Sequence, residues 1–331
     1  MDKKFKVVII NSAHPSSDVE KEVLQDIADL RSVRCNTQEE IIETSSGADA
    51  LMCADISHIP LTREVLSRLR NIKVISVYGV STDSVDVRAA KEYNIMVANV
   101  PDYGISEVAD HTMALALSLL RRIPMLDRAL REQGWEKTRS KIDYVRQRFG
   151  KINRLGTMTF GLLGFGRIAR AVGERAKAFE FRVIAYDPYI PDDVFSSMNV
   201  QKTDLEGLLK QSDIISSHVM LTDETRHMIG EKEFGKMKKG VFIVNTSRGA
   251  VFDQRELIRG LRDGSIGGAA LDVFEREPIE SDNPLLKMEN VIVTPHIAWY
   301  SEEAMIDQQR KTALNVRKVL SGEQPLYPVN I

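Results

Sequence analysis

Strand-like apolar runs in the second half of the chain are followed by three chemically versatile residues, Arg248, Glu277 and His296. Ligands of open α/β sheets bind at the carboxyl ends of such strands. The planar fork of Arg248 can bind the carboxylate of a 2-oxo acid and polarise its carbonyl. His296 can act as the general acid or base, and a carboxylate such as Glu277 orients an imidazole and favours its protonated form.

Each of these residues also has an ordinary structural interpretation. Arg248 fits a surface charge, Glu277 fits a solvated carboxylate, and His296 fits a capping or core histidine. The spacing of the three residues does not decide between catalysis and these alternatives.

The elements that would position the three residues alternate between short β-rich runs and longer amphipathic stretches, which is typical of parallel sheets built from βαβ units. The second half has six such runs with helices between them, which suits a doubly wound nucleotide-binding domain. The predicted fold class is therefore α/β. The predicted strands cover 6–10, 50–53, 73–77 and 95–98 in a first set, and 159–163, 182–186, 213–217, 241–244, 268–272 and 291–293 in a second set.

The segment between the two sets is less regular. Residues 112–120 are apolar and predict a helix that ends near Arg121 and Arg122, where positive charge is favourable. Pro124 predicts the start of a further helix. Residues 135–154 are polar and basic without a clear period, so they predict a surface loop or an oligomerisation arm.

A cofactor fingerprint follows the predicted strand 159–163. Gly164 permits a sharp turn, Gly166 lets the backbone approach a pyrophosphate, and Ala169 lets the next helix pack closely on the strand. Asp187 lies about 20 residues beyond this turn, where an acid hydrogen-bonds the adenosine ribose of a dinucleotide. The alternative is a glycine turn that only packs a helix on a sheet, and the strand, helix and acid together favour the cofactor.

Asp187 also predicts which dinucleotide binds. Its carboxylate would repel the 2′-phosphate of NADP, and the following residues, 188–190, bring no arginine to accept that phosphate. The predicted cofactor is NAD.

Composition excludes several classes of function. The 331 residues suggest two domains, and at a net charge of −2 the basic residues are interspersed with acids, which argues against nucleic-acid binding. No stretch reaches the roughly 18 apolar residues of a membrane span, and the run Val7–Ile10 is too short for a signal peptide. Cys35 and Cys53 form no CxxC pair. We therefore expect a cytoplasmic protein with a small-molecule partner and no metal, nucleic acid or membrane.

Four runs, 161–169, 244–250, 270–278 and 294–296, resemble in their order the hallmark segments of the D-isomer-specific 2-hydroxyacid dehydrogenase family. The resemblance covers nearly the whole chain. It implies NAD-dependent reduction of a small 2-oxo acid, and the reverse reaction, with Arg248, Glu277 and His296 as catalytic residues.

The resemblance also implies a discontinuous architecture and a homodimer. A flavodoxin-like substrate domain would comprise 1–103 and 297–331, and an inserted NAD-binding Rossmann domain would comprise 104–296. The implied cofactor-binding residues are Thr112, Gly164, Gly166, Arg167, Ile168, Asp187, His218, Val219, Met220, Thr225, Thr246, Ser247 and Asp272. The implied substrate-binding residues are Tyr78, Gly79, Val80, Ser81 and Trp299.

Within the family, the runs 296–301 and 186–189 resemble the C-terminal-binding-protein branch, whose animal members are NAD(H)-binding corepressors. An NAD(H)-sensing regulatory protein with little turnover is therefore the alternative function, although a pure sensor would not need all three catalytic residues. Trp299 would line the substrate pocket or pack where the chain returns to the first domain.

The chain departs from the family at the loop expected to hold the substrate carboxylate. Many relatives have arginine where Val77 stands and glycine where Ser81 stands. The first change removes a positive charge, and the second narrows the space for the acid or adds a hydroxyl. The resemblance therefore leaves the identity of the acid open.

Overall fold

The computed structural model describes residues 4–54, 56, 58–135 and 142–330. The chain forms two compact units: unit 1 comprises Met1–Gly104 and Tyr300–Ile331, and unit 2 comprises Ile105–Trp299. Each unit is built on a parallel sheet with helices, which confirms the predicted α/β fold class.

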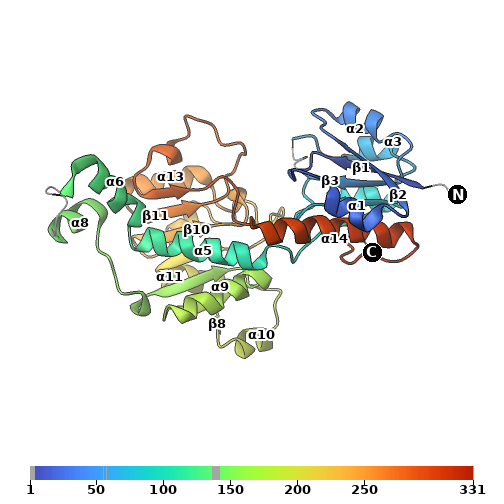
Figure 1. Cartoon of the computed structure of the whole chain (residues 1–331). Coiled ribbons are helices and arrows are strands. Elements are labelled where there is room, and N and C mark those ends of the chain that lie inside the picture. Colours follow the sequence, from blue (N-terminus) through green and yellow to red (C-terminus); the bar gives the residue numbers. More distant parts are fainter. Residues whose placement is uncertain (1–3, 55, 57, 136–141, 331) are drawn as a thin grey trace. The chain divides into compact units, whose positions relative to one another are not determined.

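Unit 1 contains a five-stranded sheet in the order β2-β1-β3-β4-β5, the flavodoxin-like order. Alternate residues of β1 face opposite layers: Val7 and Ile9 pack with α1 and α14, whereas Val8 and Ile10 pack with α2, α3 and α4. Figure 1 shows α1 and α14 on one side of this sheet and α2 and α3 on the other. The strands are β1 Phe5–Ile10, β2 Ala28–Val33, β3 Ala50–Cys53, β4 Val74–Val77 and β5 Met96–Ala98, and the helices are α1 Asp18–Leu24, α2 Gln38–Thr44, α3 Arg63–Arg68, α4 Val87–Glu92 and α14 Glu302–Leu320.

Unit 2 contains a seven-stranded sheet in the order β12-β11-β10-β9-β6-β7-β8. If β6 is counted as the first strand, the order read from β8 is 3-2-1-4-5-6-7, which is the Rossmann order with one additional strand. Helices α5 and α9 cover one face, and α11, α12 and α13 cover the other. The strands are β6 Thr159–Leu163, β7 Arg182–Tyr186, β8 Gln201–Lys202, β9 Ile214–Ser217, β10 Val241–Asn245, β11 Ile266–Leu271 and β12 Val291–Val293, and the helices are α5 Ile105–Leu120, α6 Ile123–Gln133, α8 Ile142–Phe149, α9 Arg167–Ala178, α10 Asp192–Ser197, α11 Leu205–Gln211, α12 Glu231–Phe234 and α13 Gln254–Asp263, with short 3₁₀ turns at Leu155–Thr157, Gly249–Val251 and Pro284–Lys287.

Strands β2 and β8 are absent from the sequence-based prediction. Both lie at a sheet edge, and most of their side chains are exposed or half-buried. An edge strand needs no continuous apolar face, so its sequence lacks the pattern that identifies central strands.

The segment between the sets of strands is partly helical. The helix expected at Pro124 is confirmed as α6, but the surface loop expected over 135–154 is wrong for 142–149, where α8 lies. This helix is short and polar: Ile142, Val145 and Phe149 recur at helical spacing over only eight residues, and Ile142 is 72% exposed, so the apolar pattern is too brief to stand out from the polar segment around it. Residues 136–141 of that segment lie outside the described residues.

The described part of the chain shows neither a membrane-spanning helix nor a metal-binding cluster. None of its helices combines the length and the apolar character needed to cross a membrane. None of its clusters of histidine, cysteine, aspartate and glutamate has the arrangement of a metal site.

Candidate functional site

The three expected catalytic residues meet at one edge of the unit 2 sheet. Strands β10, β11 and β12 are neighbours and run parallel. Arg248 follows β10, Glu277 follows β11 and His296 follows β12. Because the carboxyl ends of parallel strands lie at the same edge, the fold gathers residues that are distant in sequence.

His296 and Glu277 form a direct hydrogen-bonded pair. The distance from His296 Nδ1 to Glu277 Oε2 is 2.7 Å, and Glu277 Oε1 accepts the backbone N–H of Phe274 at 2.9 Å. An ionised carboxylate can only accept hydrogen bonds, so Nδ1 carries the hydrogen and Nε2 is left for a reacting group.

The Glu277 carboxyl is ionised at neutral pH. Burial acts to raise its pKa, but the hydrogen bond and charge of His296 act in the opposite direction, helped by the Phe274 N–H and the positive charge of Arg248. Together they hold the pKa of Glu277 below its ordinary value of 4.5.

A buried carboxylate, Asp272, fixes the turn that carries His296. Asp272 is 1% exposed and accepts hydrogen bonds from Thr294 Oγ1 at 2.5 Å, Ile297 N at 3.0 Å and Ala298 N at 2.9 Å. Its carbonyl oxygen accepts the His296 N–H at 2.8 Å. His296 has φ +54°, a left-handed conformation that non-glycine residues adopt only when neighbouring contacts impose it. Asp272 supplies those contacts.

Sequence reasoning missed His111, which supports the same turn. His111 Nε2 lies 3.1 Å from Thr294 Oγ1 and 3.7 Å from Asp272 Oδ1. The only sequence signal was its place on α5, one residue before Thr112. Trp299 also contacts this turn: its Nε1 donates to the His296 carbonyl at 3.1 Å.

Arg248 lies on a loop pressed against the loop that follows β11. A Cβ atom added to Gly249 would lie 1.8 Å from the carbonyl carbon of Phe274, so only glycine fits there. Asn245 Nδ2 donates to the Arg248 carbonyl at 2.9 Å, and Arg248 NH1 donates to the Ser247 carbonyl at 2.7 Å. The first bond holds the backbone of Arg248 and the second restrains its guanidinium, whose positive charge acts on the pKa of Glu277.

The cofactor fingerprint has the expected strand, turn and helix. Gly164 has φ +89°, and an added Cβ would lie 3.0 Å from Val219 Cγ1, so glycine is required. No side chain caps the N-terminus of α9, where Gly166 is the N-cap and Arg167 is the first residue. That terminus leaves N–H groups and a positive dipole end for phosphate groups.

Asp187 lies beside this turn. Its Oδ2 accepts the Phe165 N–H at 2.8 Å, and its Oδ1 accepts the Tyr189 N–H at 3.0 Å. The acid expected to select the cofactor is therefore bonded to the glycine turn itself.

Other expected cofactor residues lie at the same edge with varied exposure. Thr112 is fully buried, with its Oγ1 2.8 Å from Thr246 Oγ1, and Ser247 Oγ lies 2.8 Å from Ser217 Oγ. His218 Nε2 lies 2.9 Å from Ser216 Oγ, and burial lowers the pKa of His218 to about 3, so this histidine is neutral at physiological pH. Ile168 on α9 is half-buried, and Met220 and Thr225 belong to the loop after β9.

The expected substrate loop belongs to unit 1. Tyr78 donates its N–H to the Cys53 carbonyl and its hydroxyl to buried Glu20 at 2.6 Å, so neither donor is open to a ligand. Gly79 has φ +112° and Val80 is exposed. Among the described residues of this unit, no acceptor receives the N–H of Gly79, Val80 or Ser81. The loop therefore presents consecutive backbone donors, an arrangement that binds anions.

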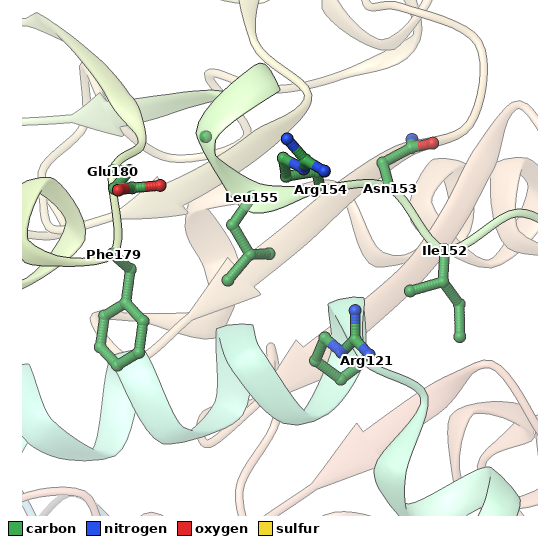
Figure 2. Close-up of a pocket in the computed structure, with 8 residues that line it drawn as sticks. Arg121, Ile152, Asn153, Arg154, Leu155, Phe179 and Glu180 are labelled. Atoms are coloured by element: carbon green, nitrogen blue, oxygen red, sulfur yellow. The ribbon is translucent and has the colours of Figure 1, made fainter.

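A surface cavity of unit 2 lies elsewhere. It has a volume of about 450 Å³ and is lined by Arg121 at the end of α5 and by residues that precede β6 and β7, at the sheet edge opposite the three expected catalytic residues. Figure 2 shows Arg121, Arg154, Leu155 and Phe179 among the side chains that line it. None of the predicted site residues lines it.

The Asp272 arrangement predicts a large loss of stability in Asp272→Ala. The change leaves the buried Ala298 N–H, the Ile297 N–H and the Thr294 hydroxyl without their acceptor, so we expect a loss of about 3 kcal/mol in the free energy of unfolding. Urea unfolding measures this, with Asp253→Ala as the control because Asp253 caps α13 and its loss should cost about 1 kcal/mol. Equal losses in the two variants would contradict the role of Asp272.

Comparison with known proteins places the chain in a family. Residues 113–298 match the family model for the NAD-binding domain of D-isomer specific 2-hydroxyacid dehydrogenases. The chain is 39% identical over 327 residues to a D-3-phosphoglycerate dehydrogenase of Methanocaldococcus jannaschii, covering 98% of this chain and 59% of that protein. It is 38% identical over 294 residues to a glyoxylate reductase of Korarchaeum cryptofilum, covering 89% of this chain and 86% of that protein.

The first of these relatives, and a second D-3-phosphoglycerate dehydrogenase matched over 54% of its length, are considerably longer than the matched region. The chain thus spans little more than half of each.

Solved structures share the fold over nearly the whole chain. A D-lactate dehydrogenase from Aquifex aeolicus, complexed with NAD and lactic acid, has a TM-score of 0.84 at 29% identity and 96% coverage of both chains. An acyclic imino acid reductase in complex with NADPH and D-Arg has a TM-score of 0.85 at 28% identity, over 98% of this chain and 100% of that one. NAD as the expected cofactor is confirmed at the level of the family. By sequence and by fold, the chain belongs to the D-isomer specific 2-hydroxyacid dehydrogenases.

Proposed function

We propose that the protein is an NAD-dependent oxidoreductase that reduces a small 2-oxo acid to the D-2-hydroxy acid and catalyses the reverse reaction. The observation that carries the proposal is the 2.7 Å pair of His296 Nδ1 and Glu277 Oε2, with Arg248 beside it in the unit that matches the NAD-binding domain. A histidine held in this way is a general acid and base with its free nitrogen available.

The residues at the glycine turn fit a dinucleotide. The left-handed Gly164 and the uncapped N-terminus of α9 at Gly166 and Arg167 suit a pyrophosphate, and Asp187 suits a ribose with two free hydroxyls. NADH, when bound, supplies the hydride that adds to the carbonyl carbon of the acid.

The remaining steps belong to three side chains. Arg248 binds the acid through its guanidinium fork and polarises the carbonyl, because two parallel N–H donors match two adjacent oxygens. His296 Nε2 gives its proton to the alkoxide that develops, and takes it back in the oxidation direction. Glu277 stabilises the positive imidazole and keeps its ring oriented.

The substrate class follows from the relatives and from the loop in unit 1. Three of the similar proteins named above have names that refer to glyoxylate, phosphoglycerate or lactate, all small acids with an oxygen next to the carboxylate, whereas a fourth is named as an imino acid reductase. We assign carboxylate binding to the N–H groups of Gly79, Val80 and Ser81. Val77 and Ser81 make the acid accepted here differ from that of relatives with arginine and glycine at these positions.

A panel of 2-oxo acids tests the proposal. We expect the protein to oxidise NADH with at least one of them and His296→Ala to lower turnover at least about tenfold, because general acid catalysis is lost. His227→Ala is the matched control, since His227 also pairs with a glutamate, Glu275 at 2.8 Å, but lies outside the catalytic set. NADH binding without turnover across the panel would refute the enzyme and favour the NAD(H)-sensing alternative.

Arg248→Lys tests the two-point binding of the acid. An ammonium lacks the planar fork, so we expect kcat/KM for the 2-oxo acid to fall about a hundredfold. Arg255→Lys, at an exposed position of α13, should leave kcat/KM unchanged. Steady-state kinetics with NADH at saturation decide the matter, and near-normal activity of Arg248→Lys would overturn the assignment.

A further inference from the structure

Two loops at the carboxyl edge of the unit 2 sheet are joined by a single side-chain bond. The Tyr189 hydroxyl donates to Glu224 Oε2 at 2.6 Å. Tyr189 follows β7 and Glu224 follows β9, and β6 lies between these strands with the glycine turn at its end. The bond therefore connects the two loops that flank the proposed cofactor turn.

Tyr189 links two carboxylates at once. Its backbone N–H donates to Asp187 Oδ1 at 3.0 Å, while its hydroxyl donates to Glu224. Tyr189 is 74% exposed, so the hydrogen bonds of its backbone N–H and its hydroxyl, and not burial in a core, fix its position. Asp187 is itself bonded to the glycine turn, which makes the chain of contacts continuous from that turn to Glu224.

The loop that carries Glu224 has a defined conformation. Thr225 Oγ1 donates to the Met220 carbonyl at 2.6 Å and accepts the Thr222 N–H at 2.8 Å. The Arg226 N–H donates to the Thr222 carbonyl at 2.9 Å. Glu224 is thus presented from a closed turn, and its position is set by the fold as well as by Tyr189.

Neither carboxylate has a basic partner within the described residues: no lysine, arginine or histidine forms an ion pair with Asp187 or Glu224. Their charges are therefore compensated only by hydrogen bonds and solvent. A phosphate group placed between the loops would meet two negative charges, and like charges within a Debye length of about 8 Å repel each other at physiological ionic strength.

We propose that Glu224, held in place by Tyr189, is a second specificity residue that acts with Asp187 to exclude the 2′-phosphate of NADP(H). The inference rests on the proposed function for the location of the adenosine ribose beside Asp187. Discrimination between the cofactors is a real requirement for this fold, because one structural neighbour is a complex with NADPH and another a complex with NAD.

The test compares the Kd values of NADPH and NADH by nucleotide fluorescence, without any 2-oxo acid. Glu224→Gln keeps the shape and an acceptor for Tyr189 but removes the charge, so we expect the NADPH/NADH ratio of Kd values to fall at least about fivefold. Asp223→Asn removes the same charge from the neighbouring exposed position and should leave the ratio unchanged.

A double-mutant cycle tests the role of Tyr189. Tyr189→Phe should lower the ratio less than Glu224→Gln does, and the double variant should match Glu224→Gln alone, because the hydroxyl acts only through the carboxylate. An unmoved ratio in Glu224→Gln, or an equal fall in Asp223→Asn, would overturn the proposal.

The readout also separates this inference from the proposed function. Binding is measured without substrate, so a protein that never turns over still yields the ratio. A protein that binds NADH but reduces no 2-oxo acid contradicts the enzyme alone, whereas one that binds neither nucleotide contradicts both.

Discussion

The buried carboxylate of Asp272 is the constraint on which the candidate site depends. It accepts hydrogen bonds from the turn at 294–298, and without it the buried Ala298 N–H and the partly buried Ile297 N–H would lose their acceptor. Residues 294–298 in this way hold His296 in a left-handed conformation, with the Nδ1 atom of His296 directed at Glu277. Backbone strain of this kind persists only where the surroundings impose it, and a reactive group is a common reason for such an arrangement.

The Rossmann sheet provides the second constraint, because its parallel strands end at one edge. Arg248, Glu277 and His296 follow the adjacent strands β10, β11 and β12. The glycine turn and Asp187 follow β6 and β7 in the other half of the same sheet. In the proposed function, acid–base chemistry and cofactor selection thus use different strands of one sheet. We propose opposite tasks for the carboxylates at this edge: Glu277 stabilises a positive imidazole, whereas Asp187 and Glu224 repel a phosphate.

Central strands and the glycine turn could be predicted from the sequence because burial on both faces leaves continuous apolar runs such as 159–163 and 241–244. Edge strands β2 and β8 lack such runs, and the eight residues of helix α8 are too few and too polar for their spacing to identify a helix, so these three elements emerged only from the structure. The support that His111 gives to the turn could not be predicted either, since this contact joins α5 to a turn far along the chain.

The three candidate catalytic residues could be proposed from their side-chain chemistry and their positions after strands. Only the resemblance to the family distinguished them from ordinary charged residues. Hydrogen bonding explains what resemblance does not, namely how Asp272 supports His296. The corepressor-like branch, the homodimer and the cytoplasmic location stay predictions.

The tautomer of His296, measured by heteronuclear NMR of the histidine rings and assigned with His296→Gln, tests this account most directly. The 2.7 Å bond to an ionised Glu277 requires the neutral ring to carry its hydrogen on Nδ1, leaving Nε2 to exchange the catalytic proton. We expect that tautomer in the wild-type protein, and we expect the preference for it to be lost in Glu277→Ala. A neutral ring with its hydrogen on Nε2 in the wild-type protein would contradict it.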